Sequence, residues 1–160
     1  MRIWRKALGT AVSVGAASIV LVQPVAATPP TPASGTILVT SLTVTSTRAA
    51  GPNTILTGVN TLAISGDVSG SATYEFTQVN HPSGALNSHG IVTCACTIDG
   101  ASGAVVLRVA GTGALGPPIT FSGTAIVLSA DGGLKELHGV FTFNQTGAVA
   151  PYSGSFHFEP

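Results

Sequence analysis

Apolar residues in this chain recur at every second position, and this period is what most constrains the fold. Side chains two apart share one face of a strand, whereas a helix repeats every 3.6 residues. No window of helical length has a 3.6-residue apolar period, so the sequence predicts an all-β protein. The alternation is clearest at Tyr74 and Phe76, at Val105, Leu107 and Val109, at Phe141 and Phe143, and at Tyr152, Phe156 and Phe158 around Gly154.

Turn residues divide the chain into eight short runs. Ser-Gly pairs recur near strand starts and bends, where glycine often marks a bulge or a barrel corner. We therefore predict an eight-stranded antiparallel barrel, which leaves no free sheet edge, with a β-sandwich as the alternative. The segment Leu134–His138 has room for one helical turn at most. Clusters of Gly, Pro, Asn and Asp separate predicted strands at 36–47, 54–65, 70–79, 90–98, 104–110, 119–129, 139–146 and 152–158.

The first 27 residues have the layout of a secretory signal peptide. Basic residues precede an apolar run over 7–22, and Val25-Ala26-Ala27 supplies small residues for cleavage after Ala27. An uncleaved anchor is the alternative, although a membrane span needs about 20 residues and this run is shorter. We predict a signal peptide over 1–27, a Pro-rich extended leader over 28–34, a barrel domain over 35–160, and a secreted or cell-envelope location.

Removal of the signal peptide changes the charge balance. The whole chain has six Lys and Arg against six Asp and Glu, whereas the residues from Thr28 onward keep three basic and six acidic side chains, a formal net charge of −3. Three scattered cations do not form the basic surface that a phosphate backbone requires, and no polybasic segment is present to hold anionic lipid. The sequence therefore predicts no nucleic-acid partner and no stable membrane insertion after cleavage, and it leaves the oligomeric state open.

One stretch matches a nucleotide-binding pattern. Gly111-Thr112-Gly113-Ala114-Leu115-Gly116 fits G-x-G-x-x-G and follows a predicted strand. In a dinucleotide site a helix starts there, with its N-terminus facing the pyrophosphate. Here Pro117 and Pro118 follow and then another β run, so we interpret this stretch as a hairpin loop. The chain also lacks a G-x-S-x-G elbow, an H-E-x-x-H pair and a P-loop, so we predict no catalytic, cofactor-binding or metal-binding residue and no cofactor.

Cys94 and Cys96 are the two cysteines of the chain, and secretion would place them in an oxidising compartment. On a regular strand they share a face, and their Cα atoms lie about 6.6 Å apart. The upper limit for a disulfide is about 6.8 Å, and a bulge would shorten the distance. A local disulfide and two reduced, buried thiols are therefore both open. A metal site with His81 and His89, which lie in a predicted loop over 80–90, is the weaker alternative.

Two charged residues lie within apolar runs. Glu75 stands between Tyr74 and Phe76, and Arg108 alternates with the apolar residues of its own run. If the aromatic residues face the interior, Glu75 is in solvent; in the reverse orientation it enters an apolar barrel and becomes a candidate acid or base. We favour the solvent-facing interpretation for both.

Three glycine patterns give the chain a family resemblance. They are G-x-x-x-G before a predicted strand, a D-G-x-x-G hairpin, and G-L-x-x-L-x-G, here Gly66 and Gly70; Asp99, Gly100 and Gly103; and Gly133, Leu134, Leu137 and Gly139. With these motifs the chain resembles a bacterial family of uncharacterised proteins with an allene-oxide-cyclase-like barrel. The resemblance implies an eight-stranded antiparallel barrel with an apolar interior, an architecture shared with plant cyclases and dirigent proteins. It carries over no catalytic residue, because the matched positions are scaffold glycines.

Three functions are compatible with such a chain. We favour a secreted, non-enzymatic barrel that binds a small apolar ligand. A structural or interaction protein of the cell surface with a filled barrel is the second, and a cyclase- or isomerase-like enzyme that uses Glu75 is the third. The state of the interior separates them. The predicted ligand-lining residues are Tyr74, Phe76, Phe141, Phe143, Tyr152, Phe156 and Phe158.

Overall fold

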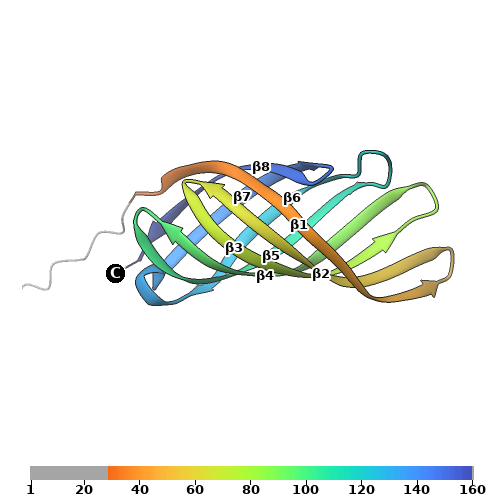
Figure 1. Cartoon of the computed structure of the whole chain (residues 1–160), viewed down its shortest axis with the longest axis horizontal. Coiled ribbons are helices and arrows are strands. Elements are labelled where there is room, and N and C mark those ends of the chain that lie inside the picture. Colours follow the sequence, from red (N-terminus) through yellow and green to blue (C-terminus); the bar gives the residue numbers. More distant parts are fainter. Residues whose placement is uncertain (1–28, 160) are drawn as a thin grey trace, which may run out of the picture.

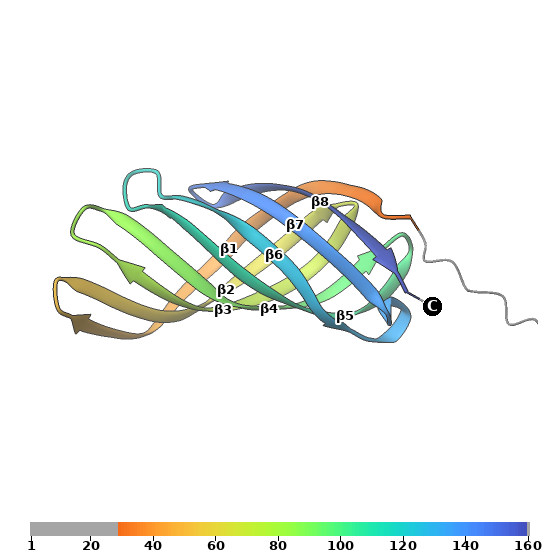
Figure 2. The ribbon, with the colours of Figure 1, turned by 180° about the vertical axis from the view of Figure 1, so that it is seen from behind.

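Eight antiparallel strands pair in sequence order and close into a barrel in the computed structural model, which describes residues 29–159 (Figure 1, Figure 2). The ring closes where the first part of β1 pairs with β8, from Thr31 opposite Phe156 to Leu38 opposite Val149. The predicted all-β barrel is confirmed, and closure excludes the sandwich. The strands are β1 Thr31–Ala50, β2 Asn53–Gly66, β3 Val68–Asn80, β4 Ala85–Ile98, β5 Ala101–Ala114, β6 Thr120–Ala130, β7 Leu137–Thr146 and β8 Val149–Phe158.

The N-terminal part of β1 corrects one predicted boundary. The segment Thr31–Ser34, predicted as the end of an extended leader, pairs with β8. Pro32 fits into this ladder because β2 pairs with β1 only from Gly35 onward, so that Pro32 has a neighbouring strand on one side only. The predicted signal peptide over 1–27 lies outside the described residues.

The start of β4 corrects a second boundary. The sequence predicts a loop over 80–90, but β4 already starts at Ala85. Leu86 and Ser88 continue the inward alternation of Val92, and both are buried. Only the turn over 81–84 therefore separates β3 from β4.

One end of the barrel, called the closed end below, is filled by the connection between β6 and β7. Here a 3-10 turn, η1 Gly132–Leu134, ends at the first residue of the segment Leu134–His138 that the sequence left open for a helical turn, and Leu137 and His138 already belong to β7. Asp131 fixes the 3-10 turn to β5, since its N–H donates to the oxygen of Ala104 (2.9 Å) and its Oδ1 accepts from the N–H of Ala104 (2.8 Å). Leu134 has no exposed surface, and a Cβ added at Gly103 would stand 3.3 Å from the Cβ of Leu134. Leu134 thus packs over Gly103 and fills the closed end of the barrel.

Large rings inside the barrel cover glycines of neighbouring strands. A Cβ added at any of these glycines would stand 2.8 Å or less from an atom of the facing aromatic side chain. The rings therefore lie against the wall. A barrel of eight strands is just wide enough to be filled by side chains or to hold one small ligand, so rings against the wall leave space at the centre. The pairs are Phe76 with Gly58, Tyr152 with Gly35, Phe121 with Gly111, and Phe141 with Gly154.

β1 changes its register against β2 twice, between Val39 and Ser41 and between Val44 and Ser46. The extra residue at Thr40 reverses the alternation, so Leu42 and Val44 line the interior together with Val39. Since β1 leaves β8 after Leu38, the β1–β2 hairpin projects beyond the neighbouring strand (Figure 1). Within residues 29–159, no helix has the length and apolar character to cross a membrane.

Candidate functional site

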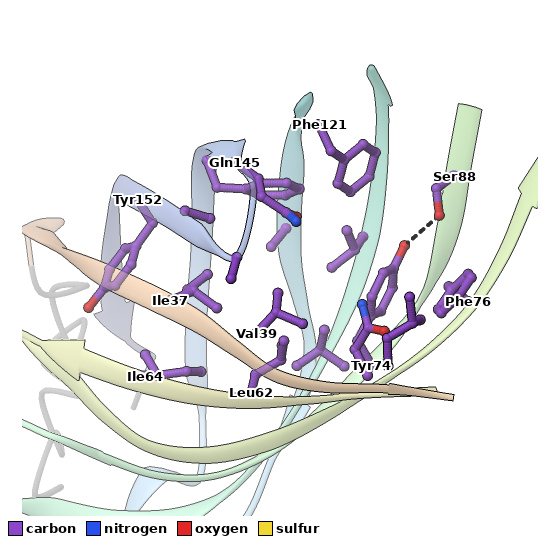
Figure 3. Close-up of a pocket in the computed structure, with 18 of the residues that line it drawn as sticks. Ile37, Val39, Leu62, Ile64, Tyr74, Phe76, Ser88, Phe121, Gln145 and Tyr152 are labelled. Atoms are coloured by element: carbon purple, nitrogen blue, oxygen red, sulfur yellow. Dashed lines mark hydrogen bonds between the residues drawn. The ribbon is translucent and has the colours of Figure 1, made fainter. Parts of the chain in front are cut away.

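The barrel encloses a cavity of about 640 Å³ (Figure 3). Each of the eight strands contributes to its wall, which consists mainly of aliphatic and aromatic side chains. Among the residues that the structure describes, no Asp, Glu, Lys, Arg or His lines it. The wall is therefore almost wholly apolar, with a few uncharged polar groups.

The cavity opens at the end opposite the first and last described residues, and we call this end the mouth. Residues that both line the cavity and are exposed mark an opening, and Leu42 is 59% exposed, Val44 46% and Ile119 45%. Leu115–Ile119, between β5 and β6, also line it, whereas the turns at the closed end do not. In Figure 1 the β1–β2 and β3–β4 hairpins lie at this end, away from the C-terminus. The rim of the mouth is therefore itself apolar.

Backbone hydrogen bonds tie the mouth connections together. The N–H of Leu115 donates to the oxygen of Gly84 (2.7 Å), and the N–H of Gly147 donates to the oxygen of Ile119 (2.8 Å). The N–H of Val39 then donates to the oxygen of Ala148 (2.8 Å). These bonds link the β3–β4 turn, the β5–β6 loop, the β7–β8 turn and β1 in succession. Backbone hydrogen bonds thus fix these connections of the mouth to one another.

Five of the seven predicted lining residues line the cavity: Tyr74, Phe76, Phe141, Phe143 and Tyr152. The other two, Phe156 and Phe158, do not. They stack edge to face at 6.1 Å between ring centroids, near the closed end where Phe158 pairs with Leu137. Alternation places both rings on the inner face, but there they pack against each other near the closed end and do not border the cavity. Phe121, which the sequence analysis did not include, lines the cavity from β6.

The two tyrosines make hydrogen bonds inside the barrel. The hydroxyl of Tyr74 lies 3.1 Å from Oγ of Ser88 (Figure 3), and burial raises the pKa of Tyr74 although this hydrogen bond opposes the shift. The hydroxyl of Tyr152 accepts a hydrogen bond from the N–H of Val68 (3.0 Å) and donates one to the backbone oxygen of Val68 (3.2 Å). Burial also raises the pKa of Tyr152, against the Val68 hydrogen bond and with a smaller contribution from the charge of Asp67. Both hydroxyls are therefore held in the neutral, hydrogen-bonding form.

Sequence reasoning missed the polar residues of the cavity. Alternation alone places Gln78 and Asn80 on the face of Tyr74, and Asn60 on the face of Leu62. The apolar period does not mark these residues, because polar side chains carry no hydrophobic signal. The missed polar residues are Asn60, Gln78, Asn80, Ser88 and Gln145.

Cys94 and Cys96 are joined by a disulfide and form part of the cavity wall. Their Cα atoms lie 5.4 Å apart, closer than the regular strand spacing. No bulge shortens this distance, because the pairing of β4 with β3 and with β5 runs through both cysteines without a register shift. The strand therefore accommodates the bond by contracting locally.

The histidines lie away from the cysteines. His81 is near the mouth, with Nδ1 3.1 Å from Oδ1 of Asn53 and Nε2 2.9 Å from Nδ2 of Asn87. His89 is exposed on the outer face of β4. In the described part of the chain, no group of three His, Cys, Asp or Glu residues is arranged to hold a metal ion. The structure therefore does not bring these histidines and the disulfide-bonded cysteines into one group.

A second pair of histidines lies on the outer face of β7 and β8. His138 and His157 are cross-strand neighbours, and their rings stack with centroids 5.4 Å apart. Both Nε2 atoms approach the carboxylate of Glu159, at 3.6 Å and 3.5 Å. This exposed cluster is separate from the cavity.

Glu75 and Arg108 are both exposed on the outer face of the barrel, so neither reaches the cavity. The glycine-rich stretch 111–116 differs from the predicted loop, because Gly111–Ala114 complete β5 and the loop begins at Leu115. Gly113 on β5 pairs with Phe121 on β6. A Cβ at Gly113 would collide with the backbone of Thr120 and Phe121, so its lack of a side chain serves sheet packing. No helix follows, and the stretch has no nucleotide-binding geometry.

Comparison with known proteins places the chain in a family. Residues 33–156 match the family model described as "Protein of unknown function (DUF3224)". The chain belongs to the DUF3224 family. The crystal structure of a DUF3224 protein of unknown function from Shewanella oneidensis MR-1 is similar, with a TM-score of 0.69 and 21% sequence identity, over 82% of this chain and 100% of that one. At this identity the likeness shows a common fold. No curated protein matches the chain.

Proposed function

We propose that this DUF3224 protein is a secreted or cell-envelope binding protein that holds one small apolar ligand inside its barrel. The observation that carries the proposal is the cavity of about 640 Å³, with an apolar wall and an opening at the mouth. Sites for small molecules typically occupy about 300–1,000 Å³. An apolar occupant removes wall and ligand surface from water, at about 25 cal/mol for each Å² buried.

The two alternative functions have less support. A filled structural barrel has no room for a cavity of this size, and its wall would be covered by side chains. A cyclase- or isomerase-like enzyme would need Glu75 or another ionisable group beside the cavity. Glu75 is exposed outside, and none of the described lining residues carries a charge.

The proposed location rests on two observations. The basic and apolar layout of residues 1–27 is typical of a secretory signal peptide. The disulfide between Cys94 and Cys96 suits an oxidising compartment. The resemblance to allene-oxide-cyclase-like barrels remains a prediction, and it agrees with a cavity that holds a small molecule.

Native mass spectrometry of protein purified from its own host tests the proposal, together with titration by the neutral fluorescent probe Nile red. We expect a mass above that of the bare chain, or saturable uptake of the probe. A bare-chain mass combined with no uptake would contradict ligand binding.

A matched pair of variants tests whether the probe binds inside the barrel. Ala125 lines the cavity, whereas Ala110, its near neighbour on β5, is exposed outside. We expect Ala125→Trp to fill the cavity and weaken Nile red binding by about tenfold or more, and Ala110→Trp to leave binding unchanged. Equal binding by the two variants would place the probe outside the barrel.

A further inference from the structure

Most uncharged polar groups of the cavity are gathered toward the mouth. Gln78 and Asn80 stand at the end of β3, Ser88 near the start of β4, and Gln145 at the end of β7, all beside connections of the mouth. Asn60 lies opposite Leu42 on one side and Tyr74 on the other. The lining nearer the closed end is apolar, including Val68, Ile98 and Leu137, apart from the hydroxyl of Tyr152, which is bonded to the backbone of Val68. We call the first group the polar collar: Asn60, Tyr74, Gln78, Asn80, Ser88 and Gln145.

Most members of the polar collar have partners. Nε2 of Gln78 donates to Oδ1 of Asn80 (2.6 Å), and Nε2 of Gln145 donates to the oxygen of Gly147 (2.7 Å). Tyr74 and Ser88 bond to each other. These hydrogen bonds satisfy polar groups that would otherwise lose their water partners, without replacement, when an apolar ligand enters the cavity.

Asn60 differs from the rest of the collar. Its Oδ1 atom is buried and has no hydrogen-bond partner among the described residues, although the side chain lines the cavity. A buried polar atom without a partner destabilises the folded protein, and such atoms are rare in native structures. Because the residue lines the cavity, rotation of its amide would present this unpartnered acceptor to the interior, where a ligand that brings a donor satisfies it.

The chemistry of the wall limits what that donor can be. Since none of the described lining residues carries a charge, a carboxylate, phosphate or ammonium head would be buried without a counter-charge. A hydroxyl avoids this cost. It donates to one side-chain atom and accepts from another, so it suits either orientation of the Asn60 amide.

We propose that the cavity selects an uncharged amphiphile, an alcohol whose hydroxyl donates to Asn60 at the polar collar while its hydrocarbon lies toward the closed end. This inference rests on the proposed function and defines its ligand class. A site with an open acceptor discriminates strongly against an analogue that lacks the donor, because the acceptor then stays unpaired.

Competition against bound Nile red tests this choice with three ligands of similar length. 1-Decanol has the donor, 1-methoxynonane has the same number of heavy atoms without it, and decanoate carries a charge. At neutral pH we expect 1-decanol to displace the probe at a concentration about tenfold lower than either of the others. Decanoic acid should approach 1-decanol when the pH falls below its own pKa, since the neutral acid carries a donor.

A pair of asparagine variants tests whether Asn60 is the residue that accepts from the ligand hydroxyl. We expect Asn60→Leu to bind Nile red but to lose the preference for 1-decanol over the ether. Asn144→Leu, on the exposed face of β7, should retain it. If Asn60→Leu does not fold, Asn60→Ala is measured in its place. Equal competition by the three ligands in the unmodified protein, or a preference that survives loss of Asn60, would overturn the ligand class while leaving apolar binding intact. Absence of Nile red binding, combined with a bare-chain mass for protein from its own host, would overturn the proposed function and this inference together.

Discussion

Phe76 and Gly58 show how single residues set the space inside this barrel. The two lie opposite each other on β3 and β2, and a Cβ at Gly58 would stand 2.7 Å from the tip of the Phe76 ring. The ring occupies the place of the missing side chain and does not extend across the barrel. The sequence predicted that Phe76 faces inward, from its alternation with Tyr74. It did not show which glycine Phe76 covers, because that depends on the pairing register.

The two tyrosines provide a test at the same scale. Burial raises the pKa of Tyr74 and of Tyr152 above the ordinary value of 10.0. Below pH 10.0 both tyrosines are protonated in the folded and the unfolded chain, and their contribution to stability is complete. Above it the unfolded chain loses protons that the folded protein keeps, so the free energy of unfolding falls as the pH rises toward the folded pKa values.

We therefore expect tyrosinate absorbance in the native protein to appear at higher pH than in the urea-unfolded protein. These are the two tyrosines of the chain, so Tyr152→Phe isolates the titration of Tyr74. Denaturant unfolding at several pH values above 10.0 should show the accompanying loss of stability. A native tyrosinate midpoint at or below that of the unfolded chain would mean that the hydroxyls are open to water.

The number and order of the strands followed from the sequence, but several strand ends did not. Period-two runs of large apolar residues mark the centres of the strands, and these were found. The ends contain small or polar residues such as Ser88 and Gly113, whose types suggest turns and whose place in the ladder depends on the neighbouring strand. The bulge at Thr40 was missed for a similar reason, since a bulge exists only relative to a partner.

The start of β1 gives a prediction at the scale of one element. Four residues before Gly35 pair with β8, and within them Ala33 is buried. The N–H of Ser34 also donates to Oδ2 of Asp67 (2.7 Å), and the N–H of Asp67 donates to the oxygen of Ser34 (3.0 Å). A chain that begins at Gly35 loses all of these contacts. We expect its melting temperature to be lower by roughly 5–10 °C than that of a chain beginning at Thr31.

A chain that begins at Thr31 is the matched control, because it removes residues 28–30 and keeps all of β1. It should melt at the same temperature as a chain beginning at Thr28. Thermal unfolding followed by circular dichroism measures all three. If the chains beginning at Gly35 and Thr31 melt together, the segment acts as the extended leader that the sequence predicted.

For the whole molecule, the cavity was harder to predict than the barrel. An eight-stranded barrel can be filled or hollow, and the composition of the strands permits both. The outcome depends on how rings and glycines face each other across strands, and on the turn of β6 to β7 that brings Leu134 into one end only. The polar collar likewise forms only when tilted strands bring Asn60, Tyr74 and Ser88 to one level. Such relations join residues far apart in the chain, so a one-dimensional pattern does not reveal them.

Because all eight strands line the cavity, a ligand inside it should stabilise the barrel as one unit. Any opening that disrupts the ring also destroys the site, so binding is linked to global unfolding. At a ligand concentration of about 100 times Kd, this linkage contributes about 2.7 kcal/mol, which slows globally limited amide exchange by about a hundredfold. We expect hydrogen exchange with saturating 1-decanol to slow in all eight strands. The tip of the β1–β2 hairpin, where Ala50 pairs with Asn53 beyond the cavity lining, should exchange at its original rate. In Ala125→Trp, whose site is at least about tenfold weaker, the same addition should slow exchange by about tenfold at most. Slowing confined to one hairpin of the unmodified protein would show binding at a local outer site instead.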